Sequence, residues 1–249
     1  KQLLASGAIG ELNMVESWLD RNSAIGAWQY SIPPDASPET VDWDRYLSDL
    51  APKRPFDAMR FFRWRNYQDY GTGLAGDLYI HLLSGLHFAV NSLGPVRVYS
   101  TGGTRYWNDG RDVPDVNLAL LDYPKTDAHP EFTLTLKVNF ASGGQLESFG
   151  TRLIGSEGVI EIGYTTVSLR RRPRETEPGF TIDTFTKATQ AKYIADYRKK
   201  YPAAAPSAAG LRQDKEDVYN AGSGYSAHHD HHRAFWNAVR TRTDRKSVV

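Results

Sequence analysis

The chain has 249 residues, which is long enough for one large domain with a substantial buried core. Hydrophobic residues make up 40% of it and charged residues 24%, the balance of a globular protein and not of a disordered or fibrous one. The 30 lysines and arginines are offset by 29 aspartates and glutamates, so the net charge of +1 predicts no nucleic-acid partner.

Cysteine is missing from the sequence, which excludes disulfide bonds, thiolate metal sites and a cysteine nucleophile. No segment approaches the roughly 20 apolar residues of a membrane-spanning helix, so we expect no membrane partner. The first ten residues do not resemble a signal peptide. Localisation therefore stays open between the cytoplasm and the periplasm.

The first half of the chain begins with signals for a helix end and a strand. Residues Lys1 to Gly7 are typical of a last helical turn closed by glycine, which favours a natural chain that starts further upstream. Polar and apolar residues then alternate for most of Glu11 to Trp18, the period of a half-buried strand. Prolines interrupt regular structure at residues 33–38, and Asp42 to Leu47 predicts a short helix.

A helix is predicted from Gly73 to Val90 because its apolar residues recur at spacings of three and four. The stripe that should face the core consists of Leu74, Leu78, Leu82, Gly85, Leu86 and Ala89.

The clearest strand runs from Phe132 to Phe140, where apolar and polar residues alternate without a break. Further strands are predicted at residues 95–100, 116–121, 145–154, 159–162 and 166–170. Short turns between successive strands favour antiparallel pairing. The predicted fold is therefore α+β, an open, mainly antiparallel sheet with helices on one face.

The last third of the chain departs from this pattern. Residues 171–224 are rich in Arg, Pro, Ala and Lys, with a near low-complexity run at 203–209, and indicate a loop-rich insertion with one helix. A final helix is predicted from Ser226 to Arg240, and residues 246–249 start a new element. We expect residues 1–249 to form a single domain that is truncated at both ends.

The segment from Gly71 to Gly76 fits the G-x-G-x-x-G expression for dinucleotide binding. That fingerprint requires a buried strand before the glycines and an acidic residue about 20 positions later. Residues 63–70 are too polar for a central strand, and no acid occurs around residues 90–92. The segment is therefore interpreted as a turn that opens a helix.

Asp77 and His81 follow this turn at a spacing of four, and Ser84 and Phe88 continue the same helical face. A carboxylate one turn away can orient an imidazole and raise its basicity, which suits a histidine that takes a proton from an alcohol. The same spacing of four also occurs around ordinary structural histidines, and spacing alone favours a structural role for His81. His87 points off this face and is interpreted as structural.

Further segments complete a family pattern. They are the glycine run from Tyr70 into the D-x-x-x-H sequence at 77–81, and residues 7–10, 42–47, 52–56, 155–158 and 232–240. Together they resemble the C-terminal domain of the glucose-fructose oxidoreductase, inositol dehydrogenase and MocA family. The match spans most of the chain outside residues 171–224, and the glycine run with D-x-x-x-H is its specific part.

The resemblance implies that His81 transfers a proton and that Asp77 binds the substrate, a sugar or polyol. It also implies NAD or NADP as cofactor, bound through a Rossmann domain that these residues do not contain, and no metal. The family's lysine in an E-K-P motif does not occur in this sequence, so the resemblance leaves the activity of this chain alone open.

Arginine and tryptophan side chains before the glycine turn are candidates for substrate binding. Guanidinium groups bind planar carboxylates through paired hydrogen bonds, and indole rings stack on sugar rings. As substrate-binding residues we favour Arg63 and Trp64 over Arg60 and Arg65. An equal alternative is that Arg63 and Trp64 cover the sheet and form surface ion pairs. Ser84 is a further candidate because it shares the face of His81.

A histidine cluster at residues 228–232 has the helical spacing of metal ligands at His228 and His232. A glutamate base and a third ligand are not evident, so a solvated helix start is favoured.

Three functions fit the sequence. The first is the substrate-binding and catalytic-helix part of an NAD(P)-dependent sugar or polyol oxidoreductase. The second is an NAD-dependent glycoside hydrolase of the α-N-acetylgalactosaminidase kind. The third is a non-catalytic sugar-binding or dimerisation module, since an open sheet face favours pairing with a second copy and hence a homo-oligomer.

Overall fold

The computed structural model describes residues 1–144, 147–172, 178–179, 181–202, 216–221 and 226–242. Its strands form one open sheet in the order β2-β3-β4-β1-β5-β6-β7-β8. The strands are β1 Leu12–Arg21, β2 Arg97–Gly103, β3 Val116–Tyr123, β4 Phe132–Asn139, β5 Glu147–Gly155, β6 Gly158–Ile162, β7 Thr166–Arg171 and β8 Asp217–Asn220. All neighbours are antiparallel except β1 and β4, which are parallel. The predicted α+β class and mainly antiparallel sheet are confirmed.

Strand β1 lies in the middle of the sheet, where it pairs with β4 on one side and β5 on the other. Val15 stands opposite Leu134 and Leu153, and all three side chains are almost fully buried. Because strand side chains alternate between faces, this register directs one set of residues to the core and the next set to the opposite face.

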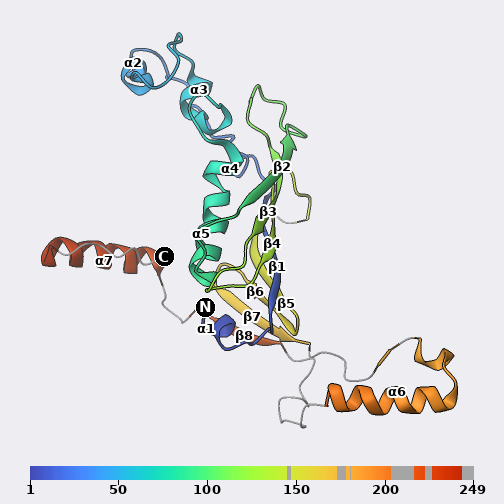
Figure 1. Ribbon diagram of the computed structural model, residues 1–249. Coiled ribbons are helices and arrows are strands. Elements are labelled where there is room, and N and C mark those ends of the chain that lie inside the picture. Colours follow the sequence, from blue (N-terminus) through green and yellow to red (C-terminus); the bar gives the residue numbers. More distant parts are fainter. Residues whose placement is uncertain (145–146, 173–177, 180, 203–215, 222–225, 243–249) are drawn as a thin grey trace.

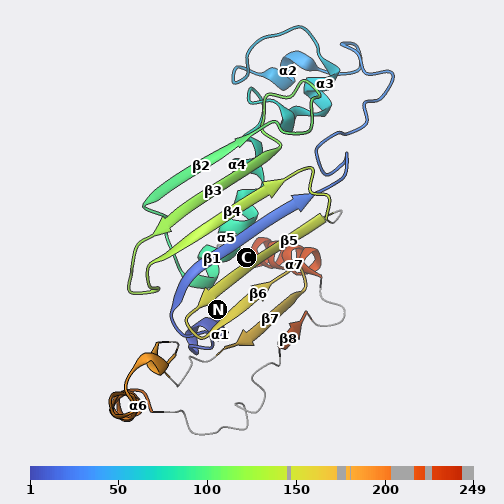
Figure 2. The same ribbon diagram turned by 90° about the vertical axis from the view of Figure 1, so that its right-hand side faces the viewer.

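Helices α4 (Gly73–Asp77) and α5 (Tyr79–Val90) cover one face of the sheet (Figure 1). The predicted leucine stripe is buried at Leu74, Leu78, Leu82 and Leu86, and it packs with the inward-facing residues of the sheet. Viewed from the other side, none of the described helices lies in front of the sheet (Figure 2). The arrangement of helices on one face is therefore confirmed.

The predicted helix from Gly73 to Val90 is interrupted at Leu78, and this corrects the sequence-based expectation of a continuous helix. Leu78 has φ −113° and ψ −40°, and the N–H of His81 donates to its carbonyl at 3.1 Å, one residue tighter than in an α-helix. The Leu78 side chain is 2% exposed. The leucine thus keeps its place in the core while the backbone changes direction between α4 and α5.

Five further α-helices and two 3₁₀ turns are described. They are α1 Gln2–Ala5, α2 Trp43–Leu47, α3 Ala58–Phe62, the 3₁₀ turns η1 Trp64–Asn66 and η2 Ile182–Thr184, α6 Lys187–Lys200 and α7 Ala227–Thr241. The predicted helices α2 and α7 and the glycine-closed turn at Gly7, whose φ is +70°, are observed. Helix α3 and turn η1 were not predicted.

The stretch predicted as an insertion contains the expected helix, α6, and also strand β8, which joins the edge of the sheet beside β7. Residues 171–224 are therefore not all loop. The run at 203–209 and the element expected at 246–249 lie outside the described residues. Among the helices that are described, none has the length and apolar character needed to cross a bilayer.

The loop between β2 and β3 is organised by Asp115, which is completely buried. Its carboxylate accepts hydrogen bonds from the backbone N–H groups of Arg105, Tyr106 and Trp107 at 2.7, 2.9 and 2.6 Å. Burial alone raises the pKa of Asp115, but these donors and Arg111 outweigh it and hold the pKa below its ordinary value. The loop conformation therefore depends on one ionised side chain.

Replacing Asp115 with alanine leaves three backbone donors without their acceptor, so we expect a loss of about 3 kcal/mol or more in the free energy of unfolding. Urea titration followed by circular dichroism measures it. The exposed Asp127→Ala is the matched control and should change stability by less than about 0.5 kcal/mol. Equal stability of the two variants would contradict the assigned role.

Candidate functional site

The glycine turn is built for close packing. A Cβ at Gly71 would lie 3.4 Å from the Cα of Arg65 and 3.5 Å from the Trp64 ring. Gly73 has φ +65°, a conformation that favours glycine, and a Cβ there would meet Val113 at 3.1 Å. The element before the turn is the short 3₁₀ turn η1 and not a strand. Gly71 therefore lets the turn pack against η1, and Gly73 lets the start of α4 pack against Val113.

Asp77 ends helix α4 and pairs with Arg65 across this turn. The Nε of Arg65 is 3.3 Å from both carboxylate oxygens. The guanidinium in turn lies 4.2 Å from the ring centroid of Trp64. Trp64, Arg65 and Asp77 thus form a contiguous, half-buried group, in which Arg65 is the member that the sequence interpretation ranked low.

His81 lies in the first turn of α5 on the solvent side of the helix, and it is exposed. Within the described residues no side chain hydrogen-bonds to its imidazole, so the expected Asp77–His81 contact is replaced by the Arg65–Asp77 pair. Two large apolar residues share this outer surface: Ile80 is 55% exposed and Phe88 54%. The ring is therefore open to a reactant on a surface that carries uncovered apolar groups.

Arg63 and Trp64 are half-buried, and Arg63 is held by backbone and side-chain partners. Its Nε donates to the carbonyl of Tyr30 at 2.8 Å, and its Nη1 donates to the side-chain oxygen of Gln29. Gln29 donates to Asp109. Arg63 is thus part of a network within the protein.

A buried ion pair anchors that network. The Arg111 side chain is 0% exposed and meets Asp109 through two hydrogen bonds of 2.8 Å. Its Nη2 also donates to the carbonyl of Ala27 at 2.8 Å. The pair ties the loop after β1 to the loop after β2, and through Gln29 to Arg63.

Ser84 is half-buried on α5, and its hydroxyl donates to the carbonyl of Ile80 one turn earlier. This bond is the ordinary way in which a helical serine satisfies its hydroxyl. The oxygen can still accept a hydrogen bond, since a hydroxyl offers two lone pairs. Its placement on α5 one turn after Ile80 leaves Ser84 close to His81 along the helix.

His87 occupies the structural role expected for it. Its Nε2 is 2.7 Å from the hydroxyl of Tyr123, a buried residue of β3. Burial, together with the nearby His129, lowers the pKa of His87, and burial raises that of Tyr123 to about 12. The neutral forms of both groups are therefore favoured in the folded state.

The histidines of residues 228–232 are exposed at the start of α7, where Ser226 caps the helix. His229 contacts Arg233, at 3.2 Å, and His231 contacts His232. In the part of the chain that the structure describes, no three His, Cys, Asp or Glu side chains are grouped as metal ligands. The cluster thus occupies the exposed first turns of a capped helix.

A nicotinamide dinucleotide does not fit the glycine turn. The glycines of this turn already pack against Trp64, Arg65 and Val113, and they follow a 3₁₀ turn instead of a parallel strand. No other G-x-G-x-x-G segment follows a strand in the described sheet.

Comparison with known proteins gives structural neighbours only. No protein-family model matches this chain, and no curated protein matches it. A levoglucosan dehydrogenase in complex with NADH is similar at 14% identity and a TM-score of 0.44, over 70% of this chain and 40% of the other. An inositol dehydrogenase homologue from Azotobacter vinelandii, complexed with NADH and myo-inositol, is similar at 14% identity and a TM-score of 0.45, over 72% and 39%.

An oxidoreductase from Sinorhizobium meliloti matches all of this chain and 51% of its own, at 13% identity and a TM-score of 0.48. The chain thus spans about 40 to 50% of the length of these structures. The first two of these structures are dehydrogenases in complex with NADH, and the third is an oxidoreductase. Substrate and mechanism have to be argued from the residues of this chain.

The lowered pKa of His87 predicts a pH dependence of stability. Below about pH 6.5 the unfolded chain takes up a proton that the folded chain binds less readily, so the folded state loses stability as the pH falls. We expect the decrease in the free energy of unfolding between about pH 7.5 and about pH 5 to be smaller in His87→Gln than in the wild type. Urea titrations at both pH values measure it. The exposed His228→Gln should behave like the wild type, and an unchanged pH dependence in His87→Gln would refute the assignment.

Proposed function

We propose that this chain is the substrate-binding and catalytic-helix part of an NAD(P)-dependent oxidoreductase that acts on a hydroxyl of a sugar or polyol. The observation that carries the proposal is the exposed imidazole of His81, which follows closely on the Trp64–Arg65–Asp77 group. An exposed imidazole supplies a base, and the Trp64–Arg65–Asp77 group, whose last member lies four residues earlier in the chain, supplies an acceptor and an aromatic surface for a hydroxylated ring.

His81 acts on the proton of the substrate hydroxyl. When the alcohol is oxidised, the imidazole accepts this proton, and in the reverse direction it returns the proton to the forming alcohol. Histidine suits both directions because its ordinary pKa lies near neutrality. No described side chain competes for the ring, which leaves it available to the reactant.

Asp77 positions the substrate, since its carboxylate is held by Arg65 and remains partly exposed. A fixed carboxylate accepts hydrogen bonds from sugar hydroxyls without reorienting. Trp64 offers an aromatic surface on which the sugar ring can stack, and Arg63 and Ser84 add hydrogen-bonding groups. The Arg63 side chain is held in place before a substrate binds, because it donates to the carbonyl of Tyr30 and to the side-chain oxygen of Gln29.

The hydride acceptor, NAD or NADP, would be bound by residues outside the described part of this chain, because the glycine turn does not fit it. A second domain seated on the outer surface of α5 would also cover Ile80 and Phe88, which are now exposed. No metal is needed for this chemistry, since the proton goes to His81.

The assignment is tested in a protein that carries this chain together with a nicotinamide-binding domain. Replacing His81 with alanine should lower kcat about 100- to 10,000-fold with a panel of cyclic sugars and polyols, while the Kd for NAD or NADP stays unchanged. Formation of the reduced nicotinamide gives the rate. The exposed His228→Ala is the matched control and should keep full turnover. Unchanged turnover in His81→Ala would exclude the histidine as the base.

The same reaction separates two catalytic alternatives. A dehydrogenase accumulates an oxidised sugar and reduced cofactor in equal amounts. An NAD-dependent glycosidase regenerates its cofactor and releases a free sugar from a glycoside. Nitrophenol release from a nitrophenyl α-N-acetylgalactosaminide, without net cofactor reduction, would favour the glycosidase.

A non-catalytic role in self-association is favoured by one separate observation. On the sheet face opposite the helices, Tyr99 of β2 stands beside Leu120 of β3. Leu118, two residues before Leu120 in β3, lies on the same face. Their side chains are 55, 49 and 45% exposed. These three residues form an apolar strip at one side of the sheet, and we propose that a second copy of the chain covers it.

Replacing Leu120 with glutamate places a charge in the strip, so we expect the dimer to dissociate at least tenfold more readily. Sedimentation velocity over a range of concentrations measures it. Leu93→Glu is the matched control, because Leu93 is fully exposed outside the strip. A monomeric wild type, or equal effects of the two substitutions, would rule out this interface.

A further inference from the structure

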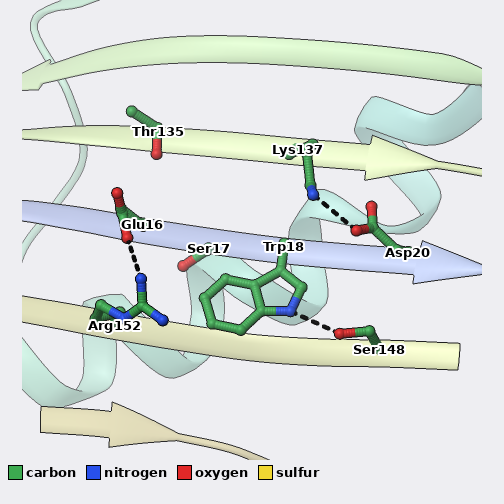
Figure 3. A pocket seen from close by; sticks show the side chains of 8 residues that line it. All are labelled: Glu16, Ser17, Trp18, Asp20, Thr135, Lys137, Ser148 and Arg152. Atoms are coloured by element: carbon green, nitrogen blue, oxygen red, sulfur yellow. Dashed lines mark hydrogen bonds and ion pairs between the residues drawn. The ribbon is translucent and has the colours of Figure 1, made fainter. Parts of the chain in front are cut away.

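A polar hollow of about 430 Å³ lies on the open face of the sheet, over β4, β1 and β5 (Figure 3). The alternation of β1 places Trp18 and Asp20 on this face, while Val15 and Leu19 point into the core beneath α5. The hollow is therefore on the side of the sheet opposite His81. Its volume falls within the roughly 300 to 1,000 Å³ of small-molecule sites.

The floor of the hollow is the indole of Trp18, which lies flat on the neighbouring strand. Gly150 stands opposite Trp18, and a Cβ at Gly150 would be only 2.4 Å from the indole Cζ2. The indole Nε1 donates to the hydroxyl of Ser148 at 2.9 Å. One face of the ring is thus turned to the sheet and the other outward, as Figure 3 shows.

Two ion pairs frame the ring. The Nζ of Lys137 is 2.7 Å from Asp20, and Arg152 is 2.8 Å from Glu16. The guanidinium of Arg152 also lies 5.5 Å from the centroid of the Trp18 ring. The Nε and Nη2 of Arg152 also donate to Glu161, so this guanidinium is held between two glutamates. The rim therefore presents fixed charged groups of both signs around a flat aromatic surface.

Asp20 lines one end of the hollow. Its side chain is 8% exposed, and Oδ2 is the oxygen that meets Lys137. The other oxygen, Oδ1, is buried and has no donor among the described residues. The Asp20 carboxylate is thus only partly satisfied by the described residues at this end of the hollow.

These features select the chemical class of the ligand. A simple anion is repelled by Glu16 and Asp20, and a simple cation is repelled by Lys137 and Arg152. A purely apolar ring would form no hydrogen bonds with the charged side chains at the rim of the hollow. A neutral ring with hydroxyl groups stacks on the indole and both donates to the carboxylates and accepts from the cations.

We propose that the Trp18 hollow is a binding site for a neutral saccharide, separate from the His81 site and independent of catalysis there. A second copy of the chain suits this part of the face less well, because interface cores are depleted of charged residues and burying such pairs is costly. The apolar strip of β2 and β3 is the better contact for a second copy.

The test is the binding of methyl β-D-glucopyranoside, methyl β-D-galactopyranoside and myo-inositol to the full chain, measured by saturation-transfer NMR and calorimetry. We expect Trp18→Ala to weaken the binding of at least one of these probes about tenfold or more. Gly150→Ala keeps the indole but forces it off the sheet, so it should weaken the same probe. Trp236→Ala removes an exposed tryptophan on α7 and is the matched control.

Circular dichroism and thermal unfolding establish that each variant is folded, and glucuronate and glucosamine test the preference for a neutral ring. Loss of binding in both Trp18→Ala and Gly150→Ala, with wild-type affinity in Trp236→Ala, supports the site. Absence of binding by the wild type, equal affinity in Trp18→Ala, or tighter binding of a charged sugar overturns it. Dissociation of a wild-type dimer by Trp18→Ala, without any saccharide binding, assigns the hollow to a second copy instead and also overturns it. Loss of His81-dependent turnover plays no part in these outcomes, so the two proposals fail separately.

Discussion

The insertion of β1 between β4 and β5 is the constraint on which the rest of the structure depends. It joins residues from the start of the chain to strands more than 100 residues later, with Val15 between Leu134 and Leu153. The pairing gives the sheet a buried face for the leucines of α4 and α5. It also sets which side chains face the opposite way, since a shift by one residue would exchange the two faces. Trp18 meets Gly150 only in this register.

Local periodicity predicted the elements well where one face is buried. The strand expected at 132–140 is observed at Phe132–Asn139, and the leucine stripe of residues 74–86 is buried. The break at Leu78 escaped prediction because Leu78 fits the stripe of a continuous helix. Strand β8 escaped it because its four residues, mostly exposed, carry little periodic signal. The parallel pairing of β1 and β4 joins distant segments, which neither pattern nor turn length encodes.

The contacts around the candidate residues could not be predicted from the sequence. The family resemblance makes Asp77 and His81 candidates, yet the partner of Asp77 is Arg65, which reaches it across the glycine turn. Nothing in the sequence couples residues 65 and 77, because the contact depends on Gly71 packing against Trp64 and Arg65. The same holds for Arg111 and Asp109, whose buried pair joins two loops and supports Arg63 through Gln29. Such networks form only after the chain has folded.

The two faces of the sheet differ in the partners of their titratable side chains. On the helix side, the exposed imidazole of His81 is flanked by uncovered apolar residues, so a covering domain would remove water and strengthen polar contacts with a reactant. On the open side, Asp20 and Glu16 beside Trp18 are each held in an ion pair, with Lys137 and Arg152 respectively. Such a surface can hold a hydroxylated ring. A single sheet can thus carry a reactive site and a purely binding site without interference, because strand alternation keeps their side chains on opposite faces.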